Sequence, residues 1–165
     1  MKLRSGRALC LAALLVCMGA PMGRAADSAA LLYPAGAATF QANCVVCHGA
    51  KGAGQPSLAP PLTTYPVRYA TIAEGRRQLV ITVLYGIFGA VVVEQKRYDF
   101  KMPDFAHFDD DTLAAVLNFV VFDLGHTPPG TAPLVAAEIA AERSRSLDGA
   151  AVRAHRAGVL TTLGL

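Results

Sequence analysis

The sequence predicts an all-α domain with a helical extension at its C-terminal end, and three observations lead to this fold class. Apolar residues between positions 110 and 124 recur at i, i+3, i+4, i+7, i+8 and i+11, the spacing of one helix face. Residues 71–86 show a similar helical spacing. Residues of the AVILMFWYC set make up 53% of the 165 positions and only 16% are charged, so the chain can build a core and is not disordered.

The first 25 residues have the three parts of a secretory signal peptide. A basic start precedes an apolar run at residues 8–20, and the small residues Gly23 and Ala25 stand at the −3 and −1 positions of a cleavage site. A membrane anchor is the alternative, but the run has 13 residues, whereas a span needs about 20. We therefore expect cleavage, and no membrane span in the mature protein.

A lipoprotein signal is a second alternative for this segment, with Cys17 as the lipid acceptor. Val16 stands where such signals carry a small residue, which argues against lipidation. Removal of the leader takes away four of the 15 basic residues, so 11 remain against 12 acidic residues. No basic run is left to follow phosphates, and this charge pattern excludes a nucleic-acid binder. We expect an exported protein of the periplasm.

The first half of the mature chain contains two predicted helices and a loop. Residues 35–47 are predicted to form the first helix. From 49 to about 69 the chain is predicted to be a loop, because it holds three glycines and four prolines. A second helix is predicted at 71–86, ended by glycine. A small hairpin is expected next, between Val91–Val93 and Tyr98.

The helix at 110–124 has the clearest pattern in the sequence. Asp109–Asp111 supply an N-cap and negative charge at the positive end of the helix dipole. Gly125 is expected to end the helix as its C′ residue. Phe119 and Phe122 widen the apolar face, so this helix is expected to pack on more than one neighbour.

The chain beyond the last of these helices is predicted to be a linker, Thr127–Gly130, and an extension with two short helices at 133–145 and 149–157. Pro133 suits the first turn of one helix, and Ser146 or Asp148 caps the other. The extension either folds back on the domain, the favoured interpretation, or serves as a docking arm for an enzyme partner. The sequence thus divides into a signal peptide at 1–25, a main domain at 26–126, and a linker with the C-terminal extension at 127–165.

Two cysteines remain after the leader is removed, in the run Cys44-Val45-Val46-Cys47, which His48 follows directly. An exported protein could join the two in a disulfide. A thioredoxin-like redox pair requires a βαβ context, which the flanking sequence lacks. A structural zinc site uses four ligands, usually from two such pairs, and this chain has one pair.

The Cys-x-x-Cys-His pattern is typical of a c-type haem attachment. Two thiols three positions apart can each add to one of the two vinyl groups of a haem, and the next residue, His48, can then bind the iron. The export signal and the lack of other cysteines in the mature chain favour this interpretation over a disulfide or zinc. We therefore expect one haem c, bound covalently at Cys44 and Cys47.

Met102 is the candidate for the second iron ligand, because it is the only methionine outside the leader. The alternative role is that of a gap-filler in the core. Pro103 argues against that role, since the residue before a proline is held in an extended conformation on a stiff loop. His48 and Met102 are 54 positions apart, enough for the chain to reach the opposite face of a haem. The rival ligands are His107, His126 and His155.

These residues together resemble the class I c-type cytochromes, small monohaem electron carriers, from about Gly36 to Gly125. The shared motifs are the Cys-Val-Val-Cys-His-Gly run at 44–49, the Pro60-Pro61-Leu62 step, Met102-Pro103, and a last apolar helix opened by acidic residues. The resemblance implies a cytochrome c-like fold, in which helices wrap around one covalently bound haem. Residues 26–126 would then be the cytochrome c domain.

The resemblance also assigns roles to individual residues. It implies that the first helix, with Gly36 and Phe40, crosses the last one at Phe119. It further implies that the backbone carbonyl of Pro61 accepts the Nδ1 proton of His48. Such a bond fixes the imidazole ring and raises its basicity.

An iron held by His48 and Met102 has no open position, so the resemblance implies a carrier of single electrons and not an enzyme. The stretch from Leu84 to Tyr98 and the Met102-Pro103 pair are most similar to exported cytochromes that take electrons from a periplasmic dehydrogenase. The expected partners are a dehydrogenase donor and an oxidase or other cytochrome acceptor of a respiratory chain. The alternative is a haem enzyme or gas sensor with an open sixth position.

Two arginines and three tyrosines are further candidates near the haem. Arg76 and Arg77 are candidates for contacts with the haem propionates, while a solvated surface is the favoured interpretation of the basic residues in this region and a docking rim is a further alternative. Tyr65, Tyr69 and Tyr98 could reach a propionate as well, with packing in the core or at its rim as the favoured alternative. The acidic residues that open the last helix are interpreted as caps, so no catalytic set is predicted.

Overall fold

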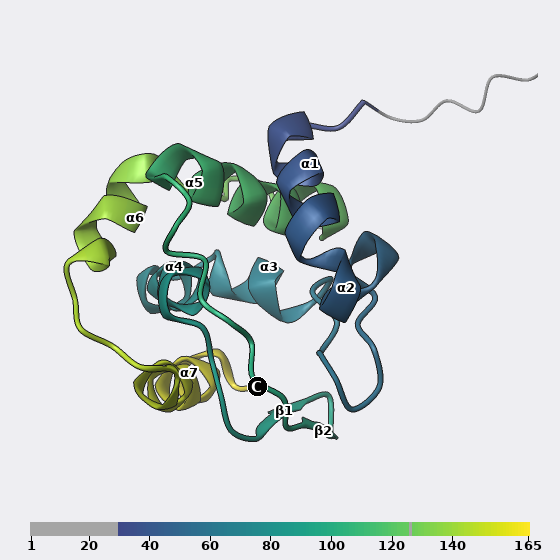
Figure 1. Ribbon diagram of the computed structural model, residues 1–165, viewed down its shortest axis with the longest axis vertical. Helices are drawn as coiled ribbons and strands as arrows, with labels where there is room; N and C mark the ends of the chain where they lie inside the picture. Colours follow the sequence, from purple (N-terminus) through teal and green to yellow (C-terminus); the bar gives the residue numbers. More distant parts are fainter. Residues whose placement is uncertain (1–29, 126) are drawn as a thin grey trace, which may run out of the picture.

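In the computed structural model, which describes residues 30–125 and 127–165, the chain folds into helices and one short β-hairpin (Figure 1). The predicted fold class is confirmed, including the hairpin. The predicted signal peptide and His126 lie outside the described residues. Among the residues described, no helix is long and apolar enough to cross a membrane.

The helical elements follow one another around a common core. In chain order they are α1 (Pro34–Asn43), α2 (Val45–His48), η1 (Ala50–Gly52), α3 (Tyr65–Tyr69), α4 (Ala73–Tyr85), α5 (Asp110–Asn118), η2 (Phe119–Leu124), α6 (Ala136–Arg143) and α7 (Gly149–Leu163). The hairpin pairs β1 (Val91–Val93) with β2 (Lys96–Tyr98) in antiparallel register. Glu94 and Gln95 form its turn with φ of 48° and 65°, and this matches the left-handed backbone of a two-residue hairpin turn.

The first predicted helix is broken in two. Residues 35–47 were expected to be continuous, but Cys44 has φ of −111° and separates α1 from α2. The predicted loop from 49 to 69 contains a helix as well, α3, with Pro66 in its first turn. A proline is compatible with that position because the amide it lacks would have no partner within the helix.

The helix α1 crosses α5 at Gly36, as the resemblance implied. A Cβ atom on Gly36 would lie 2.1 Å from the carbonyl oxygen of Ala115, so only glycine allows the two backbones to come this close. One turn further along, the rings of Phe40 and Phe119 have centroids 5.4 Å apart. Asp123 accepts hydrogen bonds from the amides that precede α1, and these fix the start of the helix.

The predicted helix at 110–124 changes its geometry in the middle. Asp109 caps it as expected, with Oδ1 accepting the amide of Thr112 at 2.7 Å. Regular α-helix ends at Asn118, and the chain continues as the π-helical segment η2. Gly125 does not adopt the left-handed conformation that was predicted for a C′ residue, since its φ is −96°. A glycine is required at this position because a larger side chain has no room: a Cβ atom there would lie 2.1 Å from Cγ2 of Val67.

The extension folds back on the domain, which confirms the favoured interpretation. Leu134, Ile139 and Val159 belong to the same buried cluster as residues of α4 and α5. Figure 1 shows α6 beside α5 and α7 beside α4. Asp148 caps α7, as one of the two predicted candidates, by accepting the amide of Ala151.

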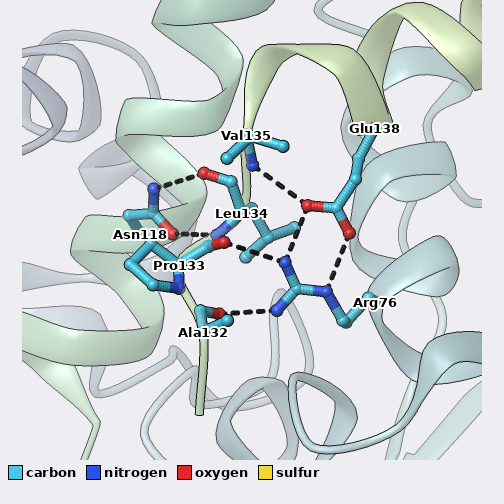
Figure 2. Close-up of polar contacts among 7 residues, drawn as sticks. All are labelled: Arg76, Asn118, Ala132, Pro133, Leu134, Val135 and Glu138. Carbon is cyan, nitrogen blue, oxygen red and sulfur yellow. Dashed lines mark hydrogen bonds and ion pairs between the residues drawn. The ribbon is translucent and has the colours of Figure 1, made fainter.

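Arg76 of α4 holds the start of the extension, and this corrects its predicted role at a haem propionate (Figure 2). Its guanidinium forms a double hydrogen bond with the Glu138 carboxylate, at 2.8 and 2.7 Å. It also donates to the carbonyls of Ala132 and Pro133. Val135 is extended, with φ of −121°, and α6 begins at Ala136 and not at Pro133 as predicted.

Asn118 provides a second connection at the same place (Figure 2). Its side chain is 5% exposed. Nδ2 donates to the carbonyl of Leu134 at 2.9 Å, and Oδ1 accepts the amide of Leu134 at 2.8 Å. Arg77 pairs with Glu142 of α6 at 3.0 Å, so neither of the arginines that were predicted at a propionate faces that way.

Candidate haem-binding site

A largely apolar cavity lies between α1, α3, α4, the hairpin and α5, and it brings the predicted site residues together. Cys44, Cys47, His48 and Met102 all line it. Its remaining walls are mainly side chains from separate helices, among them Phe40, Leu79, Leu113 and Val116. A large, planar, apolar body with two reactive vinyl groups is the kind of ligand that such walls and two thiols suit.

The single turn of α2 places the two thiols and the imidazole close together. The amides of Cys47 and His48 both donate to the carbonyl of Cys44, at 3.2 and 2.9 Å. Burial, assisted by the neighbouring Cys47, raises the pKa of the Cys44 thiol to about 11. The thiol is therefore uncharged at neutral pH, and its conversion to a thioether leaves no charge in an apolar wall.

His48 is oriented by a backbone carbonyl on its far side. Its Nδ1 lies 3.0 Å from the carbonyl oxygen of Pro60. A carbonyl can only accept, so Nδ1 carries the proton and Nε2 keeps its lone pair. Burial lowers the pKa of His48, although the bond to Pro60 opposes the shift, and a neutral imidazole is the form that binds a metal.

The acceptor was predicted to be Pro61 and is in fact Pro60. The loop is fixed by a hydrogen bond from the Leu62 amide to the carbonyl of Gly52, at 2.8 Å. Gly54, with φ of 78°, packs so closely on the Pro60–Pro61 bond that a Cβ atom would lie 2.6 Å from the Pro61 nitrogen. This contact sets which of the two successive carbonyls faces His48. Pro61 lines the cavity.

Met102 is positioned through its backbone by the residues that directly follow α4. Its amide donates to the carbonyl of Ile87 at 2.9 Å, and its carbonyl accepts the amide of Ile87 at 3.2 Å. Gly86 has φ of 69°, and a Cβ atom there would lie 2.4 Å from the carbonyl oxygen of Met102. Together with Pro103, which restricts Met102 to an extended conformation, these contacts hold the thioether side chain on the cavity wall.

The rival histidines lie elsewhere in the described part of the chain. His107 is exposed, and its ring centroid is 4.2 Å from that of Phe108. His155 has its Nδ1 at 2.7 Å from Oε1 of Gln78. Neither lines the cavity. The zinc alternative also finds no support, since no group of three or more His, Cys, Asp or Glu among the described residues could hold a metal ion.

The charged cavity residue Arg156 was not identified from the sequence. Arg156 of α7 lines the cavity near Tyr65 and Tyr69, although the extension was not expected to reach it. The side chain comes from the middle of a helix of mixed composition, where nothing in the sequence marks it. The three tyrosines named as candidates, Tyr65, Tyr69 and Tyr98, line the cavity too.

Comparisons with known proteins agree with this site. A family model described as cytochrome c matches residues 34–121. Two relatives from Thermus thermophilus, both named cytochrome c-552, are each 32% identical to the chain. The first match covers 76% of this chain and 86% of the relative, and the second covers 72% and 92%. The chain belongs to the cytochrome c family: it is an electron-transfer protein that carries haem c bound covalently through Cys44 and Cys47.

Proposed function

We propose that this cytochrome carries single electrons through an iron held by His48 and Met102. The observation that carries the proposal is that both side chains line one cavity while their backbones are fixed by unrelated parts of the fold. His48 is oriented by Pro60, and Met102 is fixed by Ile87. Two ligands held independently of the iron can keep their places in both of its oxidation states.

The chain's residues would set the properties of the iron. When bound, the haem supplies an iron that changes its charge by one. A thioether ligand favours the ferrous state and therefore raises the reduction potential. The apolar walls act in the same direction, because they disfavour the additional positive charge of the ferric state. With both axial positions taken, no site is left for a substrate or gas.

The experiment that tests this proposal compares the protein with a Met102→Ala variant. A ferric iron–thioether bond gives a weak far-red absorption band. We expect the band in the unmodified protein and its loss in the variant, together with a lower reduction potential and rapid binding of carbon monoxide. His107→Ala is the matched control and should leave all three unchanged.

Rapid carbon monoxide binding by the unmodified ferrous protein, with no far-red band in its ferric form, would contradict the proposal. That outcome would favour a haem enzyme or gas sensor with an open sixth position. The two outcomes are exclusive, since a thioether that stays bound blocks the gas.

We further propose that the protein works in the periplasm and passes electrons from a periplasmic dehydrogenase to a respiratory acceptor. The leader pattern at residues 1–25 supports export. Val46 and Phe100 line the cavity and are 75% and 61% exposed, so they offer a redox partner an apolar surface close to the haem. A mature protein that begins at Ala26 is the expected result of N-terminal sequencing, and a retained Met1 would contradict export by cleavage.

A further inference from the structure

A polar corner interrupts the apolar cavity, and part of it comes from the extension. Tyr65 and Tyr69 of α3 and Arg156 of α7 meet there. The guanidinium of Arg156 is held from two sides: Nη2 donates to the carbonyl of Val92 at 2.9 Å, and its carbon lies 5.8 Å from the centroid of the Tyr65 ring. These contacts leave most of the guanidinium N–H donors free for another acceptor.

The Tyr69 hydroxyl is the second element of this corner. Tyr69 is 6% exposed, and its hydroxyl oxygen has no hydrogen-bond partner within the described part of the chain. A buried hydroxyl without a partner is costly, so such groups usually face a ligand or an ordered water. Burial raises the pKa of Tyr69, although both the charge and the N–H donors of the nearby Arg156 guanidinium oppose the shift. The hydroxyl is therefore a proton donor at neutral pH.

The charge of Arg156 is also without a protein partner. Arg76, Arg77 and Arg143 each pair with a carboxylate, but Arg156 forms no ion pair within residues 30–125 and 127–165. The other lysine or arginine on the cavity wall, Lys101, is exposed and directly precedes Met102. A guanidinium with free donors beside a partnerless hydroxyl is a site for an anion with two oxygen atoms.

We propose that Arg156, together with the hydroxyls of Tyr69 and Tyr65, binds a propionate carboxylate of the haem. The propionates are the anionic groups of an otherwise apolar body, and a carboxylate placed in such a cavity requires a charged or hydrogen-bonding partner. The Tyr65 hydroxyl can also donate a hydrogen bond. Its oxygen accepts the amide of Glu94 at 3.4 Å, and this leaves the hydroxyl proton available for another acceptor. Arg156 thus takes the role that the sequence had suggested for Arg76 and Arg77.

This assignment makes the extension part of the haem site. The family model ends at residue 121, so the cation comes from a helix outside the matched region. The inference rests on covalent attachment at Cys44 and Cys47, and it does not depend on Met102 as an iron ligand. If the far-red band persists in the Arg156 variants, the iron–thioether bond is intact. The variants then test the propionate site separately from the proposed iron ligand Met102.

The sign of the electrostatic effect follows from the charges. A guanidinium paired with the propionate offsets its negative charge, which otherwise stabilises ferric iron. The loss of the guanidinium is therefore expected to lower the reduction potential. It also removes the charge that favours the ionised propionate, so the propionate pKa rises and the pH dependence of the potential moves to higher pH.

The test measures the reduction potential of the holoprotein as a function of pH in Arg156→Gln, Arg156→Lys and Tyr69→Phe. Arg68→Gln is the matched control, because Arg68 is an exposed arginine that donates to the extension at Leu163 and does not line the cavity. His155→Gln removes the histidine next to Arg156 in α7, whose Nδ1 lies 2.7 Å from Oε1 of Gln78. Propionate bending bands in the resonance Raman spectrum give an independent readout.

We expect Arg156→Gln to shift the potential down, to move its pH dependence upward and to change the propionate bands, with a smaller effect for Arg156→Lys. Tyr69→Phe should lower the melting temperature of the holoprotein and change the same bands. If the hydroxyl had no partner in the holoprotein, Tyr69→Phe would be neutral or stabilising. The assignment would be overturned if Tyr69→Phe and Arg156→Lys had the same potentials, pH profiles and propionate bands as Arg68→Gln. This comparison remains decisive even if Arg156→Gln fails to fold.

Discussion

A Cys44→Ser, Cys47→Ser double variant is expected to lose its cooperative fold. The two cysteines attach the haem to the turn of α2, and the walls of the cavity are apolar side chains drawn from α1, α4 and α5. Without a haem these side chains face water or empty space, and the truncation of one large aromatic side chain in a core already costs about 3–5 kcal/mol. A loss of this kind on several helices exceeds the stability of a typical domain, about 5–15 kcal/mol.

Thermal melting followed by circular dichroism, together with haem staining on a denaturing gel, provides the measurement. The double variant should show no covalent haem and no sharp transition, whereas a control with Ser57→Ala, at an exposed loop position, should behave as the unmodified protein. A double variant that melts at the unchanged temperature would show that the core does not depend on the haem.

Removal of Arg76 is expected to give the second largest effect, a destabilisation of about 2–3 kcal/mol in an Arg76→Ala variant. Arg76 is 18% exposed, and its partner Glu138 is 32% exposed. The variant loses two hydrogen bonds to the carboxylate and two to backbone carbonyls. Oε2 of Glu138 then keeps only the amide of Val135 as a donor. Denaturant unfolding of the holoprotein measures the difference.

Arg145→Ala is the matched control for this variant. Arg145 also pairs with a carboxylate of α6, Glu142, but it is 54% exposed. Glu142 is 11% exposed, but it keeps its pair with Arg77 when Arg145 is removed. The exposed Arg145 side chain is therefore expected to contribute about 0–1 kcal/mol, and this variant should be close to the unmodified protein. Equal effects of the two substitutions would contradict the role of Arg76 in holding the extension.

The same pair predicts a dependence of stability on pH. The guanidinium of Arg76 lowers the pKa of Glu138 below its usual value of 4.5. A carboxyl group whose pKa is lower in the folded state adds stability above its unfolded pKa, and this contribution is lost as the pH falls through the folded pKa. The difference in stability between the unmodified protein and Arg76→Ala should therefore shrink in acid.

The covalent site could be predicted because its chemistry is local. Cys44, Cys47 and His48 are neighbours in sequence. Met102 was proposed as the one methionine outside the leader, and it lines the same cavity. The choice between Pro60 and Pro61 was wrong, because it depends on how Gly54 packs on the bond between them. That contact is between residues several positions apart, and no local pattern contains it.

The helix boundaries and the role of the extension also separate into features that a local pattern predicts and features that depend on contacts between distant residues. The apolar spacing of 110–124 located the helix, and the cap at Asp109 is confirmed. The change to a π-helical segment after Asn118 was not predicted. Arg76 and Arg77 were placed near the haem by their distance along the chain, but acidic residues of α6, more than sixty positions away, determine where they point.

The most direct test of the whole account is the proton NMR spectrum of the ferrous holoprotein. Low-spin ferrous iron is diamagnetic, and a methyl group on a ligand atom next to the haem is shifted far upfield by the ring current of the porphyrin. We expect one methionine methyl signal in that region, assigned to Met102 and absent from Met102→Ala. A Met102 methyl signal at the ordinary position, or a spectrum broadened by high-spin iron, would show that His48 and Met102 do not hold the iron together.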